Sequence, residues 1–335
     1  MTQHNPASAP VLTDPFGRHI EYVRLSVTDR CNLRCSYCLP KGFRDFEVPD
    51  EWLDFAEIET LMRAFAAMGL KRVRLTGGEP LVRKGLPELA ARLHAIPGIS
   101  DLSLSTNAVL LERHAESLRQ AGISRLNISL DSLKPQRFSE ITGGGRLDKA
   151  LAGIMAAKDA GFGPVKINMV ALKGINDDEY EHMVEFCLEH DFTLRFIETM
   201  PVGSTGRWAS SHYHSLDDVR ALLKRRFELV PGVMPGGGPA RYEQVAGTEL
   251  RIGFITPISR HFCETCNRVR LSADGQLYLC LGQDARYDLR SVLRSGADDA
   301  ALQAAIVEAL ALKPQKHEFT DKPEQVVRFM SMTGG

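Results

Sequence analysis

The chain has 335 residues, of which 44% are hydrophobic and 25% are charged, with a formal net charge of −1. This length suits one large α/β unit or two smaller ones, and the near-zero charge gives no support for a nucleic-acid or membrane-surface protein. No apolar run approaches the roughly 18 residues of a membrane span, and the first ten residues lack the order of a secretory signal, so we expect a cytoplasmic protein without a membrane partner.

Short β-rich runs alternate with helical patterns along the first two thirds of the chain. We predict strands over residues 22–27, 72–76, 102–106, 126–131, 165–172 and 194–199. Helical patterns lie between them, at 55–69, 85–96, 147–161 and 177–190. Those at 55–69 and 147–161 end at a glycine. Six strands with intervening helices predict a parallel sheet, either open and doubly wound or closed into a complete or partial barrel.

The pattern changes after the sixth predicted strand. The turn-rich stretch PGVMPGGGPARY, at 231–242, predicts a linker or a mobile loop. We therefore divide the chain into a flexible N-terminus (1–18), an α/β unit (19–230) and a C-terminal region (231–335). In the last region a β-hairpin is predicted to turn at SADGQ, residues 272–276.

Six of the seven cysteines form two triplets: Cys31, Cys35 and Cys38, and Cys263, Cys266 and Cys280. Disulfides are not expected in a cytosolic protein. A four-iron cluster normally takes four thiolates, so each triplet would leave one iron for another ligand. Zinc with His261 as fourth ligand is the alternative for the second triplet, although Arg268 and Arg270 beside it favour a substrate anion. Cys187 is expected to be a buried apolar residue.

Polar residues recur at the C-terminal ends of the predicted strands, where both folds place their ligands. They are TGGEP at 76–80, STNA at 105–108, Ser129, Asp131, Lys166, Asn168, Glu198 and Met200. Chance does not account for such clustering in six successive units.

Basic residues also stand among apolar neighbours inside the predicted strands. They are Arg24, Arg72, Arg74, Lys166 and Arg195. An inward-facing charge is costly unless it is paired. Exposure to solvent, or pairing with Glu79 or Glu198, would explain single members of the set. A bound polyanion such as a nucleoside triphosphate explains the whole set better.

Two motifs resemble those of the radical S-adenosylmethionine (SAM) enzymes. CNLRCSYC, at 31–38, has their CX3CXΦC form with Tyr37 as the aromatic residue, and TGGEP resembles the motif that binds the methionyl amino group. In that family SAM chelates the fourth iron through its amino and carboxylate groups. One electron from the cluster then cleaves the sulfonium to give methionine and a 5′-deoxyadenosyl radical.

Over nearly the whole chain the sequence resembles the GTP 3′,8-cyclases of molybdenum cofactor biosynthesis. The motifs are RLSVTDRCNLRCSYC, RLTGGEPLVR, LNISLDSL, KGIND, RFIETMPVG, FCETCNRVRLSADG and the terminal Gly334-Gly335. The resemblance implies an incomplete (βα)6 TIM-like barrel, a second 4Fe–4S cluster in the C-terminal region, a homodimer, and an electron donor of the flavodoxin or ferredoxin type.

The resemblance also implies a reaction. The deoxyadenosyl radical removes the ribose 3′ hydrogen of GTP, the carbon radical attacks guanine C8, and the resulting aminyl radical is reduced. The product is (8S)-3′,8-cyclo-7,8-dihydroguanosine 5′-triphosphate, which the downstream cyclic pyranopterin monophosphate synthase would use.

Roles carry over by matching motifs. The first triplet would hold the SAM cluster, and the second would hold a cluster whose free iron binds the guanine of GTP. The SAM contacts would be Tyr37, Gly78, Ser129 and Met200. The GTP contacts would be Arg24, Arg72, Arg74, Ser105, Lys166, Arg195, Arg268, Val269 and Arg270. Arg268, Arg270, Gly334 and Gly335 would serve catalysis, with the double glycine reaching back into the active site.

The sequence departs from the family pattern at one turn, and two alternative functions stay open. The third strand reads LSTNA where relatives commonly have a threonine pair and a glycine, which leaves the turn at Ala108 open. A radical enzyme acting on a peptide is one alternative, although such enzymes typically use more C-terminal cysteines. A non-catalytic zinc-binding protein is the other.

Overall fold

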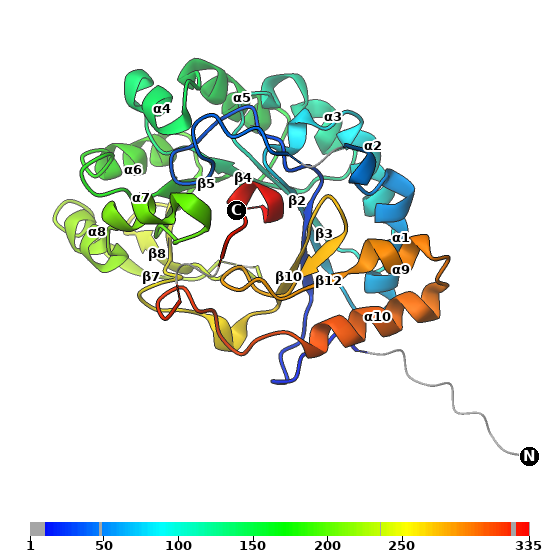
Figure 1. The fold of residues 1–335 in the computed structure, drawn as a ribbon. Coiled ribbons are helices and arrows are strands. Elements are labelled where there is room, and N and C mark those ends of the chain that lie inside the picture. The colour runs from blue at the N-terminus through cyan, green and yellow to red at the C-terminus, as the bar shows by residue number, and fades with distance from the viewer. Residues whose placement is uncertain (1–10, 47–48, 235, 323–325, 335) are drawn as a thin grey trace, which may run out of the picture.

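A curved sheet organises the structure, a computed structural model that describes residues 11–46, 49–234, 236–322 and 326–334. Six parallel strands run side by side in chain order: β1 (Tyr22–Ser26), β2 (Arg72–Thr76), β3 (Asp101–Thr106), β4 (Arg125–Ser129), β5 (Lys166–Val170) and β6 (Thr193–Ile197). All six overlap the strands predicted from the sequence. They form the wall of the incomplete barrel, and Figure 1 shows the helices around its outside.

Helices cover the outer face between successive strands. They are α1 (Phe55–Ala67), α2 (Leu86–His94), α3 (Ala115–Gln120), α4 (Pro135–Thr142), α5 (Leu147–Asp159) and α6 (Tyr180–Glu189). α1 begins at a capping box, in which the Asp54 carboxylate accepts from the Glu57 backbone N–H at 2.8 Å and the Glu57 carboxylate accepts from that of Asp54 at 2.9 Å. Cys187 on α6 is fully buried, as predicted.

The C-terminal region extends the same sheet at both edges. β9 (Arg251–Ile255) pairs in parallel with β6, and β10 (Arg268–Leu271) pairs in parallel with β1. Antiparallel strands continue beyond them: β8 (Arg241–Val245) and β7 (Leu229–Gly232) on one side, and β11 (Gln276–Tyr278) and β12 (Arg286–Asp288) on the other. The predicted hairpin at 272–276 is confirmed, because β10 and β11 pair across it.

The turn-rich stretch at 231–242 differs from its prediction as a linker. Its two ends belong to the paired strands β7 and β8, so the stretch is a hairpin connection within the sheet. Proline and glycine are frequent there because the chain must turn between two short edge strands.

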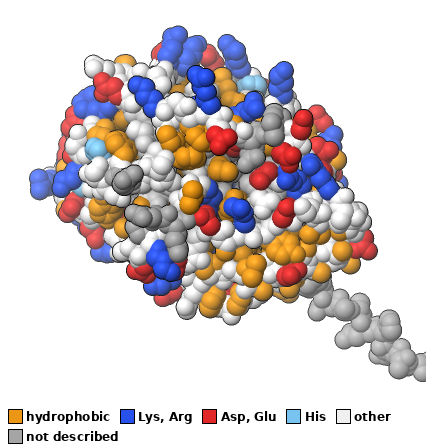
Figure 2. Space-filling model, viewed as in Figure 1, with side chains coloured by type: hydrophobic (Ala, Val, Ile, Leu, Met, Phe, Trp, Pro, Cys, Tyr) orange, Lys and Arg blue, Asp and Glu red, His pale blue; other side chains and the backbone are white. Residues whose placement is uncertain are grey.

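Further helices and 3₁₀ turns complete the described structure. The α-helices are α7 (Gly206–Ser211), α8 (Leu216–Leu223), α9 (Leu289–Arg294), α10 (Asp299–Ala311) and α11 (Met330–Thr333). The 3₁₀ turns are η1 (Pro49–Glu51), η2 (Pro80–Val82), η3 (Leu111–Arg113), η4 (Gly203–Thr205) and η5 (Cys263–Thr265). Figure 2 shows charged side chains of both signs around the edge of the viewed face and hydrophobic side chains nearer its centre.

Candidate active site

The first cysteine triplet lies in the loop that follows β1. Its three cysteines line one cavity, here named the first cysteine cavity. All four residues assigned to SAM line the same cavity: Tyr37, Gly78, Ser129 and Met200. Ser105, which was assigned to GTP, also lies here, away from the arginines assigned to the same ligand. The sequence assignment of the SAM contacts therefore describes one continuous surface.

Gly78 of the TGGEP motif is needed because two backbone segments meet there. Its N–H donates to Thr28 O at 2.9 Å, and the next N–H, of Glu79, donates to Arg30 O at 2.8 Å. A Cβ on Gly78 would lie only 2.7 Å from Asp29 O. The glycine thus lets the end of β2 approach the chain that leads into the cysteine loop.

Buried carboxylates surround the first cysteine cavity. Glu79 accepts from Thr106 Oγ1 and from the Asn107 backbone N–H, both at 2.8 Å, and burial raises the pKa of this carboxyl to about 7. Glu198 accepts from Tyr213 Oη at 2.9 Å and from Ser259 Oγ at 2.5 Å. Neither carboxylate pairs with a strand arginine, contrary to one explanation of the basic residues. A cavity with this charge favours a cationic ligand.

A third carboxylate, Asp131, stands behind the aromatic residue of the cysteine loop. It accepts from Tyr37 Oη at 2.6 Å and from the Val170 backbone N–H at 2.8 Å. Burial raises the pKa of Asp131 to about 6. The same effect raises the pKa of Cys31 to about 11 and that of Cys38 to about 12. Burial thus favours the neutral thiol form of these two cysteines.

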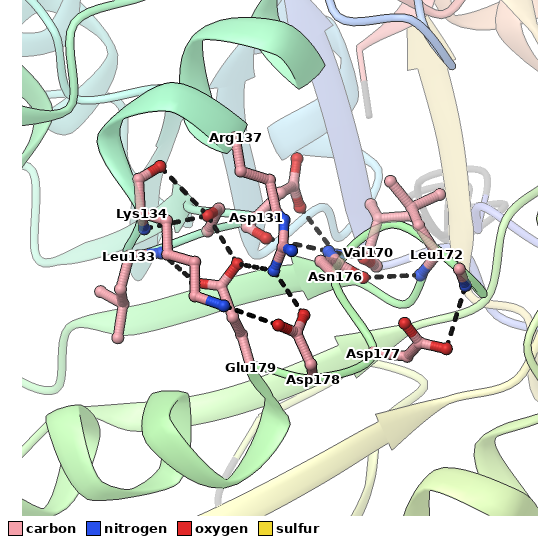
Figure 3. Close-up of polar contacts among 12 residues, drawn as sticks. Asp131, Leu133, Lys134, Arg137, Val170, Leu172, Asn176, Asp177, Asp178 and Glu179 are labelled. Atoms are coloured by element: carbon pink, nitrogen blue, oxygen red, sulfur yellow. Dashed lines mark hydrogen bonds and ion pairs between the residues drawn. The ribbon is translucent and has the colours of Figure 1, made fainter.

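The segment after β5 fixes Asp131 in place (Figure 3). Asn176, from the KGIND motif, donates through Nδ2 to Asp131 O at 2.8 Å and to Val170 O at 2.9 Å. The nearby buried Glu179 accepts from the Leu133 backbone N–H at 2.8 Å and from Arg137 at 2.6 Å. These bonds join the β4–α4 and β5–α6 connections, so the support of Tyr37 is rigid.

The second cysteine triplet lines another cavity, here named the second cysteine cavity. It shares this cavity with four residues assigned to GTP: Arg24, Arg268, Val269 and Arg270. Ile197 and Met200 line both cysteine cavities, so the two cavities adjoin at the end of β6. A ligand in one can therefore reach a ligand in the other.

The parallel pairing of β10, β1 and β2 places three arginines abreast. Arg270 is in register with Arg24, and Arg24 is in register with Arg74. Neighbouring strands are about 4.8 Å apart, so like charges are crowded. Burial and the adjacent arginines lower the pKa of Arg74 to about 9, and they lower that of Arg270 well below its usual value. A row of buried and half-buried cations of this kind favours a bound polyanion.

The other arginines assigned to GTP line a third cavity, here named the basic cavity. Its basic side chains are Arg72, Arg74, Arg125, Lys166 and Arg195. Arg72, Arg125 and Lys166 begin their strands, so this cavity lies at the N-terminal ends, opposite to the expected edge. Glycines 236, 237 and 238 of the β7–β8 connection also line it.

Not all of these cations are free to act on a ligand. Arg72 forms ion pairs with Glu21 at 3.1 Å and with Asp101 at 3.7 Å. Lys166 forms no ion pair within the described residues, and burial, followed by the charge of Arg195, lowers its pKa to about 7. Arg125 was not singled out from the sequence, although its place at the start of β4 repeats that of Arg72 at the start of β2.

The C-terminal tail enters the barrel, as Figure 1 shows. Arg270 donates through Nη1 to Thr333 O at 3.0 Å and to Gly334 O. The backbone of Ser331 forms a hydrogen bond with the thiol of Cys38. Gly334 has φ +71°, and a Cβ on it would overlap the side chain of Thr76. The tail therefore touches residues of both cysteine cavities, while Gly335 lies outside the described residues.

The turn left open by the sequence is resolved at Ala108. This buried alanine takes φ +62°, a conformation that usually belongs to glycine. Two local bonds hold it: its N–H donates to Thr106 Oγ1 at 3.1 Å, and the Val109 N–H donates to Asn107 Oδ1 at 3.1 Å. The alanine thus keeps the turn that a glycine would make.

Comparisons with known proteins identify the family. The profile of the Radical SAM superfamily matches residues 25–187, and that of Molybdenum Cofactor Synthesis C matches residues 192–319. GTP 3′,8-cyclase 2 of Pseudomonas aeruginosa is 48% identical over 97% of this chain and 98% of its own. The GTP 3′,8-cyclase of Hydrogenovibrio crunogenus is 45% identical over 97% of this chain and 99% of its own. The chain belongs to the GTP 3′,8-cyclase family.

Solved structures agree with the fold of this family. Streptococcus suis SuiB bound to S-adenosylmethionine superposes with a TM-score of 0.60 over 85% of this chain and 67% of that one, at 15% identity. This likeness concerns the radical SAM fold alone. Within the described part of the chain, no helix combines the length and apolar character that crossing a bilayer requires.

Membership of the GTP 3′,8-cyclase family implies a 4Fe–4S cluster and SAM, and the first cysteine cavity fits both. Three thiols line it, which is one fewer than a cube binds, so one iron is left for a small ligand. Buried carboxylates nearby suit the cationic sulfonium of SAM. Arg125 lies outside the motifs that the sequence offered. Asn107 and Asn176 lie inside the STNA and KGIND motifs, but no role was assigned to them, because each acts through contacts with distant segments.

Proposed function

We propose that this chain converts GTP to (8S)-3′,8-cyclo-7,8-dihydroguanosine 5′-triphosphate, the first step of molybdenum cofactor biosynthesis. One observation carries the proposal. A cysteine cavity bordered by carboxylates adjoins a cysteine cavity bordered by a row of arginines, and Ile197 and Met200 line both. The first suits a cation and the second suits a polyanion, as a reaction between SAM and GTP requires.

In the first cysteine cavity, Cys31, Cys35 and Cys38 would hold the SAM cluster. When bound, this cluster would supply one electron that cleaves SAM to the radical that abstracts the ribose 3′ hydrogen. Tyr37, which Asp131 holds at 2.6 Å, would form part of the wall for SAM. Gly78, Ser129 and Met200 line the same cavity and would complete the SAM contacts.

In the second cysteine cavity, Cys263, Cys266 and Cys280 would hold a second 4Fe–4S cluster that takes the guanine of GTP. The donor set fits, because all three thiols line one cavity beside arginines. Arg24, Arg268 and Arg270 would bind oxygen atoms of GTP there, and the basic cavity would take its remaining negative charge. Charge-assisted bonds from arginine are among the stronger polar contacts in proteins.

The tail would order the substrate between the two cavities. Arg270 donates to Thr333 O at 3.0 Å and lines the second cysteine cavity, so it could contact both the tail and GTP. The further partners that we propose are a flavodoxin- or ferredoxin-type electron donor, a second copy of the chain, and a cyclic pyranopterin monophosphate synthase that receives the product. The units 1–18, 19–230 and 231–335 are proposed as the functional division.

The test is anaerobic reconstitution with iron and sulfide, followed by incubation with SAM, dithionite and one of GTP, ATP or a peptide pool. We expect a cyclised nucleotide from GTP alone, together with 5′-deoxyadenosine. Modified peptide with no nucleotide product would favour the peptide-modifying alternative. Zinc without iron or labile sulfide after anaerobic purification and reconstitution would contradict both radical functions.

A further inference from the structure

Each cysteine of the second triplet has its own buried cation, supplied by a distant segment of the chain. Arg18 donates through Nη1 to Cys263 O at 2.8 Å, and Arg328 donates through Nη2 to Cys280 O at 2.8 Å. Lys313, just after α10, places Nζ 3.8 Å from Cys266 Sγ. The third contact differs from the other two because it reaches the ligand atom itself.

The two arginines are neutralised locally, whereas the lysine is not. Arg18 pairs with Asp14 at 2.5 Å, and Arg328 pairs with Asp284. Lys313 is only 3% exposed, and it forms no ion pair with a carboxylate within the described residues. Its ammonium donates to Arg268 O at 3.1 Å and to Leu279 O at 2.5 Å.

Two carbonyl dipoles accept two of the three ammonium hydrogens of Lys313, but they do not cancel its charge. A buried, uncompensated ammonium is costly, and a lysine in such a place normally has an anion nearby. Of the groups that can carry a negative charge, Cys266 is the one that the ammonium itself contacts, at 3.8 Å.

The geometry points to Lys313 as the positioning residue of the second cluster site: its ammonium holds Cys266 and offsets the negative charge of a cluster bound by three thiolates. This inference rests on the second cluster of the proposed function. An iron–sulfur cube with three thiolates is negatively charged and becomes more so on reduction. A fixed positive charge beside it stabilises the reduced form, so Lys313 raises the reduction potential.

A purely structural lysine would behave differently. Lys313 also fastens the end of α10 to β10 and to the residue after β11, through the carbonyls of Arg268 and Leu279. A neutral donor of similar size could keep such bonds without affecting a cluster. The experiment must therefore separate the charge of the side chain from its hydrogen bonds.

The test uses the full chain with Cys31, Cys35 and Cys38 changed to serine, so that only a cluster at the second triplet contributes. Into this background we would introduce Lys313→Gln, which removes the charge but keeps a donor, and Lys313→Met, which removes both. The measurements are iron and sulfide content after anaerobic reconstitution, and an EPR-monitored potential titration with dithionite.

We expect the potential to become more negative in both variants, with the greater loss of iron in Lys313→Met. Lys313→Arg, which retains the charge, should restore the parental potential. Lys316→Met is the matched control, because that lysine has a 62% exposed side chain and pairs with Asp321 at 3.2 Å. It should leave both measurements unchanged.

The outcomes separate the two levels of inference. A cluster that binds fully and keeps the parental potential in Lys313→Gln and Lys313→Met would overturn the role of Lys313 alone. A parental protein that takes up no iron and sulfide at the second triplet would overturn the second cluster itself, and this inference with it. A shift of the same size in Lys316→Met would also overturn it, since general surface charge would then be the cause.

Discussion

The two cysteine cavities have the same number of cysteines and opposite electrostatic surroundings. Around the first triplet lie the buried carboxylates of Glu79, Asp131 and Glu198. Around the second lie the buried cations of Arg268, Arg270 and Lys313. Burial raises the pKa of Cys31 to about 11 and also raises the pKa values of Cys263 and Cys280. At Cys266 the nearby cations, Lys313 foremost, outweigh burial and lower the pKa.

This difference indicates that separate parts of the molecule set the spacing of the cysteines and the charge of the small molecule that each cavity favours. Under the proposed function, the segments that carry the cysteines would hold the two clusters. The strands behind them would select the small molecule, because a cation is stabilised by one surrounding and a polyanion by the other. The comparison predicts distinct consequences for changes at each site.

The largest effects are expected from the cysteines themselves. Changing Cys31, Cys35 and Cys38 to serine should abolish SAM cleavage, because no electron can reach the sulfonium. Changing Cys263, Cys266 and Cys280 should leave some uncoupled SAM cleavage but no cyclised nucleotide. Iron should fall from roughly eight to roughly four atoms per chain in either variant. Product formation by the second variant, measured by anaerobic chromatography, would remove the distinction between the sites.

The next effect concerns Gly334, where the tail joins the two sites. Gly334→Ala would force a Cβ against Thr76 in a backbone conformation with φ +71°. We expect product formation to fall by more than about tenfold, while both clusters and the binding of SAM and GTP persist.

The control for this variant is Gly247→Ala. Gly247 has φ +74° but no atom within 4 Å of a Cβ, so it reproduces the backbone strain without the collision. If both variants lose activity equally, the position of the tail between the cavities is not the reason. Deletion of Gly334 and Gly335 should give the same loss as Gly334→Ala.

A smaller effect should distinguish Arg268, which forms no ion pair with a carboxylate in the described part of the chain, from Arg72, which forms two. Arg268→Ala removes a buried cation that contacts the rings of Tyr22 and Phe262, and we expect GTP binding to weaken by about tenfold or more. Arg72→Ala should cost less, because Glu21 and Asp101 already neutralise Arg72. Calorimetry on reconstituted protein measures both. Equal losses would mean that local pairing does not decide which cations bind GTP.

The smallest effect is a proton uptake on ligand binding, which only the anion site should show. The pKa of Lys166 is lowered to about 7 by burial and by Arg195, and a bound triphosphate would raise it again. GTP affinity should be constant below pH 7 and should fall above it by at most about tenfold per pH unit, since binding then requires proton uptake. Calorimetry in two buffers of different ionisation enthalpy detects that proton. Lys166→Arg should abolish the uptake, whereas SAM binding should not show it.

The sequence predicted the elements whose information is local. The six central strands have β-rich runs of their own, and the cysteines and TGGEP have fixed spacing, so both were found. The parallel pairing of β9 with β6 and of β10 with β1 was not predicted, because the sequence of a short apolar strand does not indicate which strand it pairs with. Lys313 and Arg328 were missed for the same reason: each contacts the second triplet from a segment that carries no motif.

The basic residues show where sequence reasoning stops even when it finds the right side chains. Arg24, Arg72 and Lys166 were grouped together, yet the structure pairs Arg72 with carboxylates and leaves Lys166 without one among the described residues. Ser105 was grouped with them but lines the first cysteine cavity. Alternation along a strand gives the face of a side chain, but not its neighbours on other strands.

The pairing of β10 with β1 has a consequence for how the molecule forms. The two strands lie more than two thirds of the chain apart in sequence. Their pairing carries a large loop-closure cost, so we expect this contact to form late in folding. Until it forms, β1 has an open edge on one side, and an unpaired edge invites association with other chains. The row of three arginines is complete only once β10 pairs with β1, so a truncated barrel would be prone to aggregation and would lack Arg270 beside Arg24.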